Sequence, residues 1–163
     1  MPGILNMGEM GALALHTMLE VAKRRRENKV DWISVTELAD ILDASKHTLH
    51  KVSKRLVEAG LLDSSRGPLG GVKLSGDAGQ VTLLEIIEAV EGQVNSTGCL
   101  FARRVCSTES ICQFCGITQD LENVVRGYFA TTTIADLAKR LIPGYKFGPP
   151  ITRRVAGENS DII

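Results

Sequence analysis

All four cysteines of the chain lie in one short stretch, at Cys99, Cys106, Cys112 and Cys115. A deprotonated thiol is a soft ligand for zinc or iron, and it is also the reactive species in thiol–disulfide exchange. Free cysteines are usually buried one at a time within helices or strands. The grouping therefore indicates that these thiols share a chemical role.

Three chemistries use thiols in such a group. Disulfides require an oxidising compartment, but the apolar N-terminal residues contain Glu9 and no preceding basic region, unlike a signal peptide. We therefore expect a reduced, cytoplasmic protein. Structural zinc sites typically use two close cysteine pairs, and only Cys112 and Cys115 have that spacing. An iron–sulfur cluster is wider and accepts uneven spacing, so it is favoured, with zinc as the alternative.

The composition limits the kinds of partner. With 163 residues, of which 44% are hydrophobic and 23% charged, the chain is long enough for one globular domain with a core. No run approaches the roughly 18 apolar residues of a membrane span, so we expect no membrane partner. The formal net charge is +0, so binding to nucleic acid requires basic residues concentrated in one place.

The first part of the chain predicts a helix-turn-helix motif. Residues 8–26 have the apolar spacing of a helix. Ser34 and Glu37 have the spacing of a capping box that opens a short second helix. After a brief turn, Ser45 is expected to cap a third helix that ends near Gly60.

The third helix is predicted to have one apolar and one basic face. Residues 46–55 contain cations and histidines but no acid, whereas an ordinary surface helix intersperses acids with bases. The outward side chains recur at helical spacing and are His47, His50, Lys51 and Lys54. This pattern indicates a helix that binds DNA in the major groove.

A β-hairpin wing is predicted after this helix. Two short predicted strands flank a glycine-rich turn within residues 61–74. Arg66 and Lys73 lie where such a hairpin meets phosphate or the minor groove. The residues that we predict to contact DNA are Ser45, Lys46, His47, His50, Lys51, Lys54, Arg55, Arg66, Gly70 and Gly71.

The second half of the chain predicts a dimer. Thr82 and Glu85 form a capping box that opens a helix ending at Gly92. Beyond the cysteines, apolar residues at 3–4 spacing predict a long helix whose stripe is too extensive to be wholly internal. We expect this helix to pack on the same helix of a second subunit, because helix-turn-helix proteins usually bind two half-sites as symmetric dimers.

These elements predict a mainly α fold with a small β-hairpin wing, in a single domain over residues 1–141. We expect a DNA-binding part at about residues 8–92, a cysteine loop over 93–116 and dimerisation helices over 117–141. Residues 142–163, which begin with a turn-rich stretch, are predicted to form a flexible tail. No nucleotide-binding fingerprint or nucleophile–base pair is present, so we expect neither enzyme activity nor a small-molecule substrate.

The order of these features resembles that of the bacterial IscR/NsrR/RirA regulators. The resemblance covers about residues 8–141 and rests on the Arg66-Gly67-x-x-Gly70-Gly71 wing, the Val90-Glu91-Gly92 stretch, and a cysteine loop before a long helix. It implies a homodimeric winged-helix transcription factor, such as a repressor. In that family an iron–sulfur cluster senses cluster supply, nitric oxide, iron or redox state.

The resemblance also implies ligands. Cys99, Cys106 and Cys112 match the three cluster thiolates of the family, although the first gap is one residue longer than usual. IscR-like members have a histidine three residues after the third cysteine, and this chain has Cys115 there, a candidate fourth thiolate. The fourth ligand and the cluster type, 4Fe-4S or 2Fe-2S, stay open. The alternative function is a winged-helix DNA-binding protein whose cysteine loop holds structural zinc or acts as a thiol-based switch.

Overall fold

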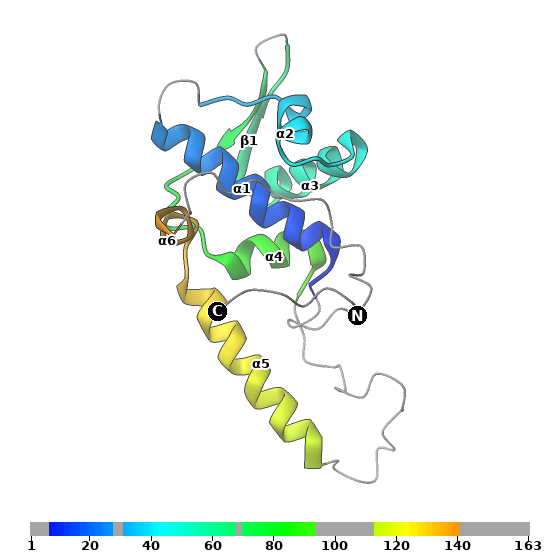
Figure 1. The fold of residues 1–163 in the computed structure, drawn as a ribbon, viewed down its shortest axis with the longest axis vertical. Coiled ribbons are helices and arrows are strands. Elements are labelled where there is room, and N and C mark those ends of the chain that lie inside the picture. Colours follow the sequence, from blue (N-terminus) through cyan, green and yellow to red (C-terminus); the bar gives the residue numbers. More distant parts are fainter. Residues whose placement is uncertain (1–6, 28–30, 68–69, 94–112, 141–163) are drawn as a thin grey trace, which may run out of the picture.

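The computed structural model describes residues 7–27, 31–67, 70–93 and 113–140 (Figure 1). Within these ranges the chain forms helices and one two-stranded hairpin. In chain order they are α1 (Glu9–Glu27), α2 (Val35–Ile41), α3 (Lys46–Glu58), β1 (Leu62–Ser65), β2 (Gly71–Leu74), α4 (Leu83–Glu91), α5 (Gln113–Thr131) and α6 (Ile134–Lys139). The predicted fold class, mainly α with a small wing, is confirmed. No described helix is both long and apolar enough to cross a bilayer.

Helix α1 crosses the middle of the body and organises the core. It packs against α3, α4, α6 and β2, and Figure 1 shows it between the α2–α3 pair and α4. Its Met18 is fully buried, together with Leu49 of α3, Ile86 of α4 and Ile134 of α6. Burial of side chains of this size stabilises a domain by about 1.5–3 kcal/mol each, so α1 fixes the relative positions of these helices.

The helix-turn-helix is formed by α2 and α3, with differences from the prediction at both caps. Ser34 Oγ accepts from the backbone N–H of Glu37 at 3.1 Å, as a capping box requires. The predicted reciprocal hydrogen bond, from the Ser34 backbone N–H to the Glu37 carboxylate, is wrong, because this carboxylate pairs with Arg24 of α1 instead. Ser45 occupies the N-cap of α3, but its side chain makes no capping hydrogen bond. Helix α3 is thus positioned mainly by its apolar face.

The wing is an antiparallel hairpin, as predicted. Its register runs from Leu62 opposite Leu74 to Ser65 opposite Gly71. The backbone of Val72 also exchanges hydrogen bonds of 2.9 and 2.8 Å with Ile33, which joins the wing to the segment before α2. Gly71 has a φ of 156°, and a Cβ there would collide with the Ile33 carbonyl. Only glycine fits at this position.

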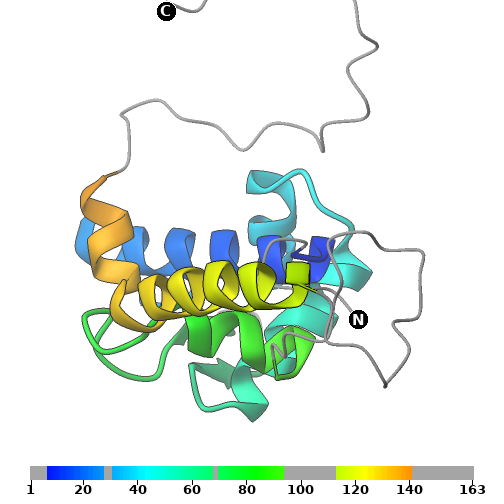
Figure 2. The same cartoon turned by 90° about the horizontal axis from the view of Figure 1, so that it is seen from below.

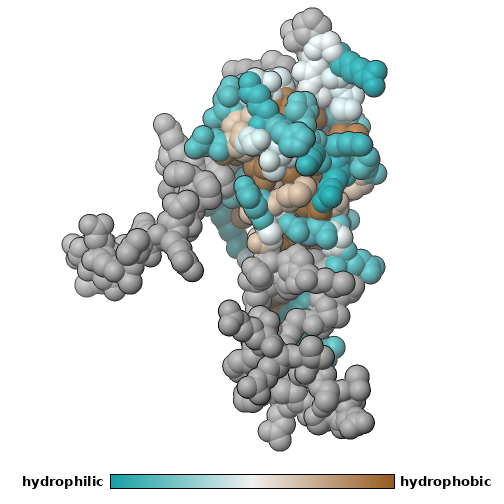
Figure 3. All heavy atoms as spheres, turned by 90° about the vertical axis from the view of Figure 1, so that its right-hand side faces the viewer, coloured by the Kyte–Doolittle hydropathy of each residue, from teal (hydrophilic) through white to brown (hydrophobic). Residues whose placement is uncertain are grey.

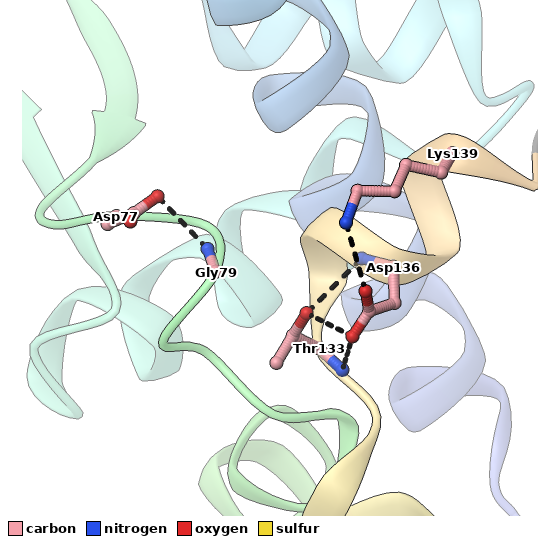
Figure 4. A network of polar contacts seen from close by, with 5 residues as sticks. All are labelled: Asp77, Gly79, Thr133, Asp136 and Lys139. Atoms are coloured by element: carbon pink, nitrogen blue, oxygen red, sulfur yellow. Dashed lines mark hydrogen bonds and ion pairs between the residues drawn. The ribbon is translucent and has the colours of Figure 1, made fainter.

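Helices α4 and α6 begin with matching capping boxes. The side chain of Thr82 accepts from Glu85 N at 3.3 Å, and that of Thr133 accepts from Asp136 N at 3.2 Å. Figure 4 shows the Thr133–Asp136 box, in which Asp136 also receives a hydrogen bond from Lys139. Thr82 and Thr133 form an isolated β-bridge, so the starts of the two helices are fixed to one another.

Helix α5 projects beyond the rest of the body (Figure 1), and Figure 2, which looks from below, shows it in front of α1 and α4. It begins at Gln113, earlier than the predicted boundary at residue 117. Its inner side rests on α4, where Val125 and Phe129 pack against Ile87. Arg126 Nη1 and Glu88 Oε1 form an ion pair of 2.9 Å across the same contact. Only one side of α5 is therefore used by the contact with α4.

Candidate nucleic-acid interface and cysteine segment

Helix α3 separates its apolar and basic side chains, as the sequence predicts. Leu49, Val52 and Leu56 are fully buried. The outward side chains His47, His50, Lys51 and Lys54 are exposed, and we call this set the basic face. Figure 3, which views the side of the molecule that carries α2 and α3, shows hydrophilic side chains over most of its coloured surface. The basic face has the geometry of a helix that enters a groove of a polyanion.

The cations of the basic face are almost unopposed. Lys54 Nζ lies 3.7 Å from Glu58 Oε1, but both side chains are well exposed, at 77% and 61%. An exposed pair of this kind contributes at most about 1 kcal/mol and is easily replaced. Within the described ranges no ion pair involves Lys46 or Lys51, both of which are exposed. These charges are available to a phosphate backbone.

The wing adds a second set of predicted contacts beside α3. Arg66 and Ser45 are exposed. Gly70 and Gly71 lie where the hairpin turns back, close to the backbone of residues 65–66 and of Ile33. Lys73 has another role, because its Nζ lies 3.9 Å from Asp63 Oδ2 and 4.9 Å from the centre of the Trp32 ring. Lys73 therefore stabilises the wing.

An open hollow separates the basic face from the wing. It is lined by His50, Ser53 and Lys54 of α3 on one side and by Ser64 and Ser65 of β1 on the other. Ser53 is only 4% exposed, and its Oγ has no hydrogen-bond partner in the described part of the chain. A buried hydroxyl without a partner is costly, so a polar group bound in the hollow would be favoured.

Arg55 is predicted to support phosphate contacts, but the structure gives it another partner. Its Nη1 donates to the backbone carbonyl of Val90, in the last turn of α4. The carbonyls of a last helical turn lack partners within the helix, and a cation there also favours the helix dipole. Contact with DNA from Arg55 stays a prediction, whereas its contact with α4 was not foreseen.

Helix α5 carries a second apolar stripe that faces away from the body. Ile117, Leu121, Val124 and Tyr128 recur at helical spacing and are exposed by 55%, 47%, 70% and 50%, and we call them the outer face of α5. Arg140 donates to Tyr128 Oη at 2.8 Å, and this hydrogen bond lowers the pKa of the Tyr128 phenol. An exposed apolar patch of this kind marks an interaction surface.

The predicted metal ligands follow α4 in the sequence. Cys99, Cys106 and Cys112 are outside the described residues, and Cys115 is in the first turn of α5. Within the described ranges, no group of three or more histidine, cysteine or acidic residues could hold a metal ion. The donor set fits an iron–sulfur cluster by its chemistry, because up to four thiolates are the ligands that such a cluster prefers.

Comparison with known families decides what kind of protein has this architecture. A family model described as "Rrf2: Iron-dependent Transcriptional regulator" matches residues 7–140. The chain belongs to the Rrf2 family. The predicted resemblance to IscR-type regulators is thus confirmed. Relatives of this Rrf2 chain are transcriptional regulators and not enzymes, and transcription regulation through DNA is the function of the family.

Individual relatives of the Rrf2 chain agree with the family match. The HTH-type transcriptional regulator IscR of Cronobacter sakazakii is 30% identical over 133 residues, which cover 82% of this chain and 80% of that protein. IscR of Photorhabdus laumondii is 29% identical over 133 residues, covering 82% and 79%. Among solved structures, CymR of B. subtilis has a TM-score of 0.68 at 24% identity, covering 83% of this chain and 97% of CymR. IscR of T. potens has a TM-score of 0.63 at 19% identity, covering 85% and 93%.

Sequence reasoning missed how the end of α4 is held. Glu91 Oε1 accepts from the backbone N–H of Gly11 in the first turn of α1 at 2.8 Å. The sequence feature that could have indicated this contact is the pair Gly8 and Gly11 at the start of a predicted helix. Glycine in a helix costs about 0.5–1 kcal/mol relative to alanine, so two of them in one turn indicate that another group approaches closely.

Proposed function

We propose that this Rrf2-family chain is a homodimeric, cytoplasmic DNA-binding regulator whose DNA affinity depends on an iron–sulfur cluster held by Cys99, Cys106, Cys112 and Cys115. The observation that carries the proposal is the grouping of every thiol between the end of α4 and the first turn of α5. The matching family is described as iron-dependent, and the similar proteins include IscR regulators, which supports the same reading.

DNA binding by α3 and the wing is supported by charge and exposure. The basic face enters the major groove, where His47, His50, Lys51 and Lys54 meet base edges and adjacent phosphates. Lys46 and Ser45 contact the sugar–phosphate backbone, and Arg66 with Gly70 and Gly71 approaches the minor groove. A sugar–phosphate strand separates the two grooves, so it passes over the hollow between α3 and the wing. Its oxygens could accept from the Ser53 hydroxyl, which has no hydrogen-bond partner among the described residues.

Dimerisation through α5 is supported by its two apolar sides. Val125 and Phe129 are used by the chain's own core, while the outer face has no cover in the described part of the chain. The outer face of a second copy is the same surface, and a self-complementary apolar stripe is what a two-fold symmetric interface requires. The pairing of two α5 helices would also set the distance between the two basic faces.

Control of DNA binding follows from where the thiols lie. When bound, the cluster would supply covalent links among cysteine sulfur atoms that are otherwise not joined to each other. Residues 99–115 then connect α4 and α5 in one arrangement, and α5 presents the two basic faces at the spacing of two half-sites. A tenfold change in DNA affinity requires only about 1.4 kcal/mol of difference between the two arrangements. Loss of the cluster through nitric oxide, oxidation or iron shortage would thereby change the regulated gene's expression.

The test is the chemistry of protein purified without air. We expect iron and acid-labile sulfide, and visible absorption from thiolate-to-iron charge transfer. Cys106→Ala should abolish this absorption, whereas Ser107→Ala, its neighbour in the same segment, should leave it unchanged. Cys115→Ala reports whether the fourth thiol is a ligand, because a lost thiolate shifts the spectrum. Colourless protein that contains zinc, or thiols that form disulfides reversibly without any metal, would instead support the zinc site or the thiol switch.

A further inference from the structure

The last turn of α4 is the point at which the DNA-reading helix meets the start of the cysteine segment. Val90 and Glu91 lie in this turn, and the chain then leads through Gly92 toward Cys99. Val90 is 1% exposed and belongs to the same buried core as Leu56 of α3. A shift of this turn therefore cannot be absorbed by empty space, because protein cores are closely packed.

Two polar contacts hold the turn, one to α3 and one to α1. On the side of α3, Arg55 Nη1 donates to the Val90 carbonyl. On the side of α1, Glu91 Oε1 accepts from Gly11 N at 2.8 Å. A Cβ on Gly8 would lie 2.6 Å from Glu91 Oε1, and a Cβ on Gly11 would lie 3.1 Å from the same oxygen. A Cβ on Gly8 would thus force the carboxylate to shift, and a Cβ on Gly11 would crowd it.

Arg55 lies between the helix proposed to bind DNA and the helix that leads to the cysteine segment. It follows Lys51 by one helical turn, so it continues one edge of the basic face toward the end of α3. Its guanidinium is nevertheless bound to α4 and not directed at solvent alone. A charge-assisted hydrogen bond is stronger than one between neutral groups, and this one goes to a carbonyl that lacks a helical partner, so it can couple the two helices.

We propose that Arg55 is a positioning residue that transmits the state of the cysteine segment to α3, and that its main role is not to contact DNA. The inference rests on the proposed function, since it assumes that the cysteine segment has two states. While the cluster is bound, the last turn of α4 keeps its place, and the Val90 carbonyl accepts from Arg55 and fixes the last turn of α3. When the cluster is lost, this turn shifts, Arg55 loses its acceptor, and α3 is held by its apolar face alone.

The experiment compares operator affinities of the cluster-loaded and cluster-free forms. The operator is a duplex that the wild-type loaded protein selects from a random-sequence pool. Arg55→Gln should reduce the ratio of the two affinities by about fivefold or more, the lower end of typical couplings. The two forms of the variant should therefore bind the operator with more similar affinities. Lys54→Gln is the matched control: it removes a cation from the neighbouring residue, and it should weaken both forms equally and leave the ratio unchanged.

Each other outcome has a definite meaning. If Arg55→Gln weakens both forms equally, Arg55 is a phosphate contact and the inference is wrong. If it changes neither affinity nor ratio, the inference is also wrong. If the wild-type forms already bind alike, the proposed function fails, whatever Arg55 does.

A measurement on the wild-type protein avoids any loss of folding in the variant. Hydrogen exchange should show that the amides of Val57, Glu58 and Ala59, at the end of α3, lose protection when the cluster is removed. The amides of α6, which lies away from this contact, should keep theirs. Equal protection of the end of α3 in both forms would overturn the inference.

Discussion

Helices α3 and α5 are built alike and differ in what they turn outward. Each packs an apolar side on α4, and each leaves a regular stripe of side chains exposed. The stripe of α3 is cationic, and that of α5 consists of Ile117, Leu121, Val124 and Tyr128. The same packing on α4 thus supports one surface suited to a polyanion and another suited to a second copy. The difference shows that an outward face identifies a partner when the inward face already explains the fold.

We expect the largest effect from a charge on the outer face of α5, because it would remove the apolar character that distinguishes this face from the basic face of α3. We expect Val124→Glu to raise the dimer dissociation constant by about 100-fold or more, because burying an unpaired carboxylate costs several kcal/mol. Operator affinity should fall with it, since a single subunit reads only one half-site. Sedimentation velocity measures the first effect and an operator titration the second. Asn123→Glu adds the same charge to another exposed side of α5 and should leave the dimer intact.

A smaller effect is expected when one charge is removed from the basic face. Lys51→Gln should weaken operator binding several-fold and reduce the slope of log affinity against log salt by about 1, if Lys51 neutralises one phosphate. The measurement is fluorescence anisotropy over a range of salt concentrations. Lys139→Gln removes an exposed cation from α6 and serves as the control. A slope unchanged by Lys51→Gln would place Lys51 away from the DNA backbone.

The smallest effects are expected at the N-caps of α4, α6 and α3. Thr82→Ala and Thr133→Ala each remove a side-chain cap and should cost about 1 kcal/mol of the free energy of unfolding, measured by urea denaturation. Ser45→Ala should cost close to nothing, since the Ser45 side chain caps no backbone N–H of α3. Equal losses at all three positions would mean that these contacts do not decide cap strength here.

Much of the fold is predictable because its signals are local. Helical periodicity and capping residues such as Thr82 predict the order of the helices, and the glycine-rich turn predicts the wing. The details that were wrong or missed are contacts between residues far apart in the chain. Glu37 has the spacing of a capping box, but Arg24 of α1 is a stronger partner for its carboxylate.

The candidate site shows the same division. The basic face follows from the spacing of His47 to Lys54 in one helix, so sequence alone predicts it. The bond from Arg55 to Val90 joins two helices whose packing no local pattern specifies. Sequence reasoning therefore placed Arg55 on DNA with its basic neighbours. Dimerisation through the outer face of α5 stays a prediction, which rests on an apolar stripe that exceeds what a core of this size can bury.

The central claim is that the cysteine segment controls how α3 meets DNA. The most direct measurement is operator affinity of one wild-type preparation, made without air, before and after removal of the cluster. We predict that affinities of the two forms differ by about tenfold or more, corresponding to at least 1.4 kcal/mol. Iron-free protein that binds the operator as tightly as the cluster-loaded form would contradict the account.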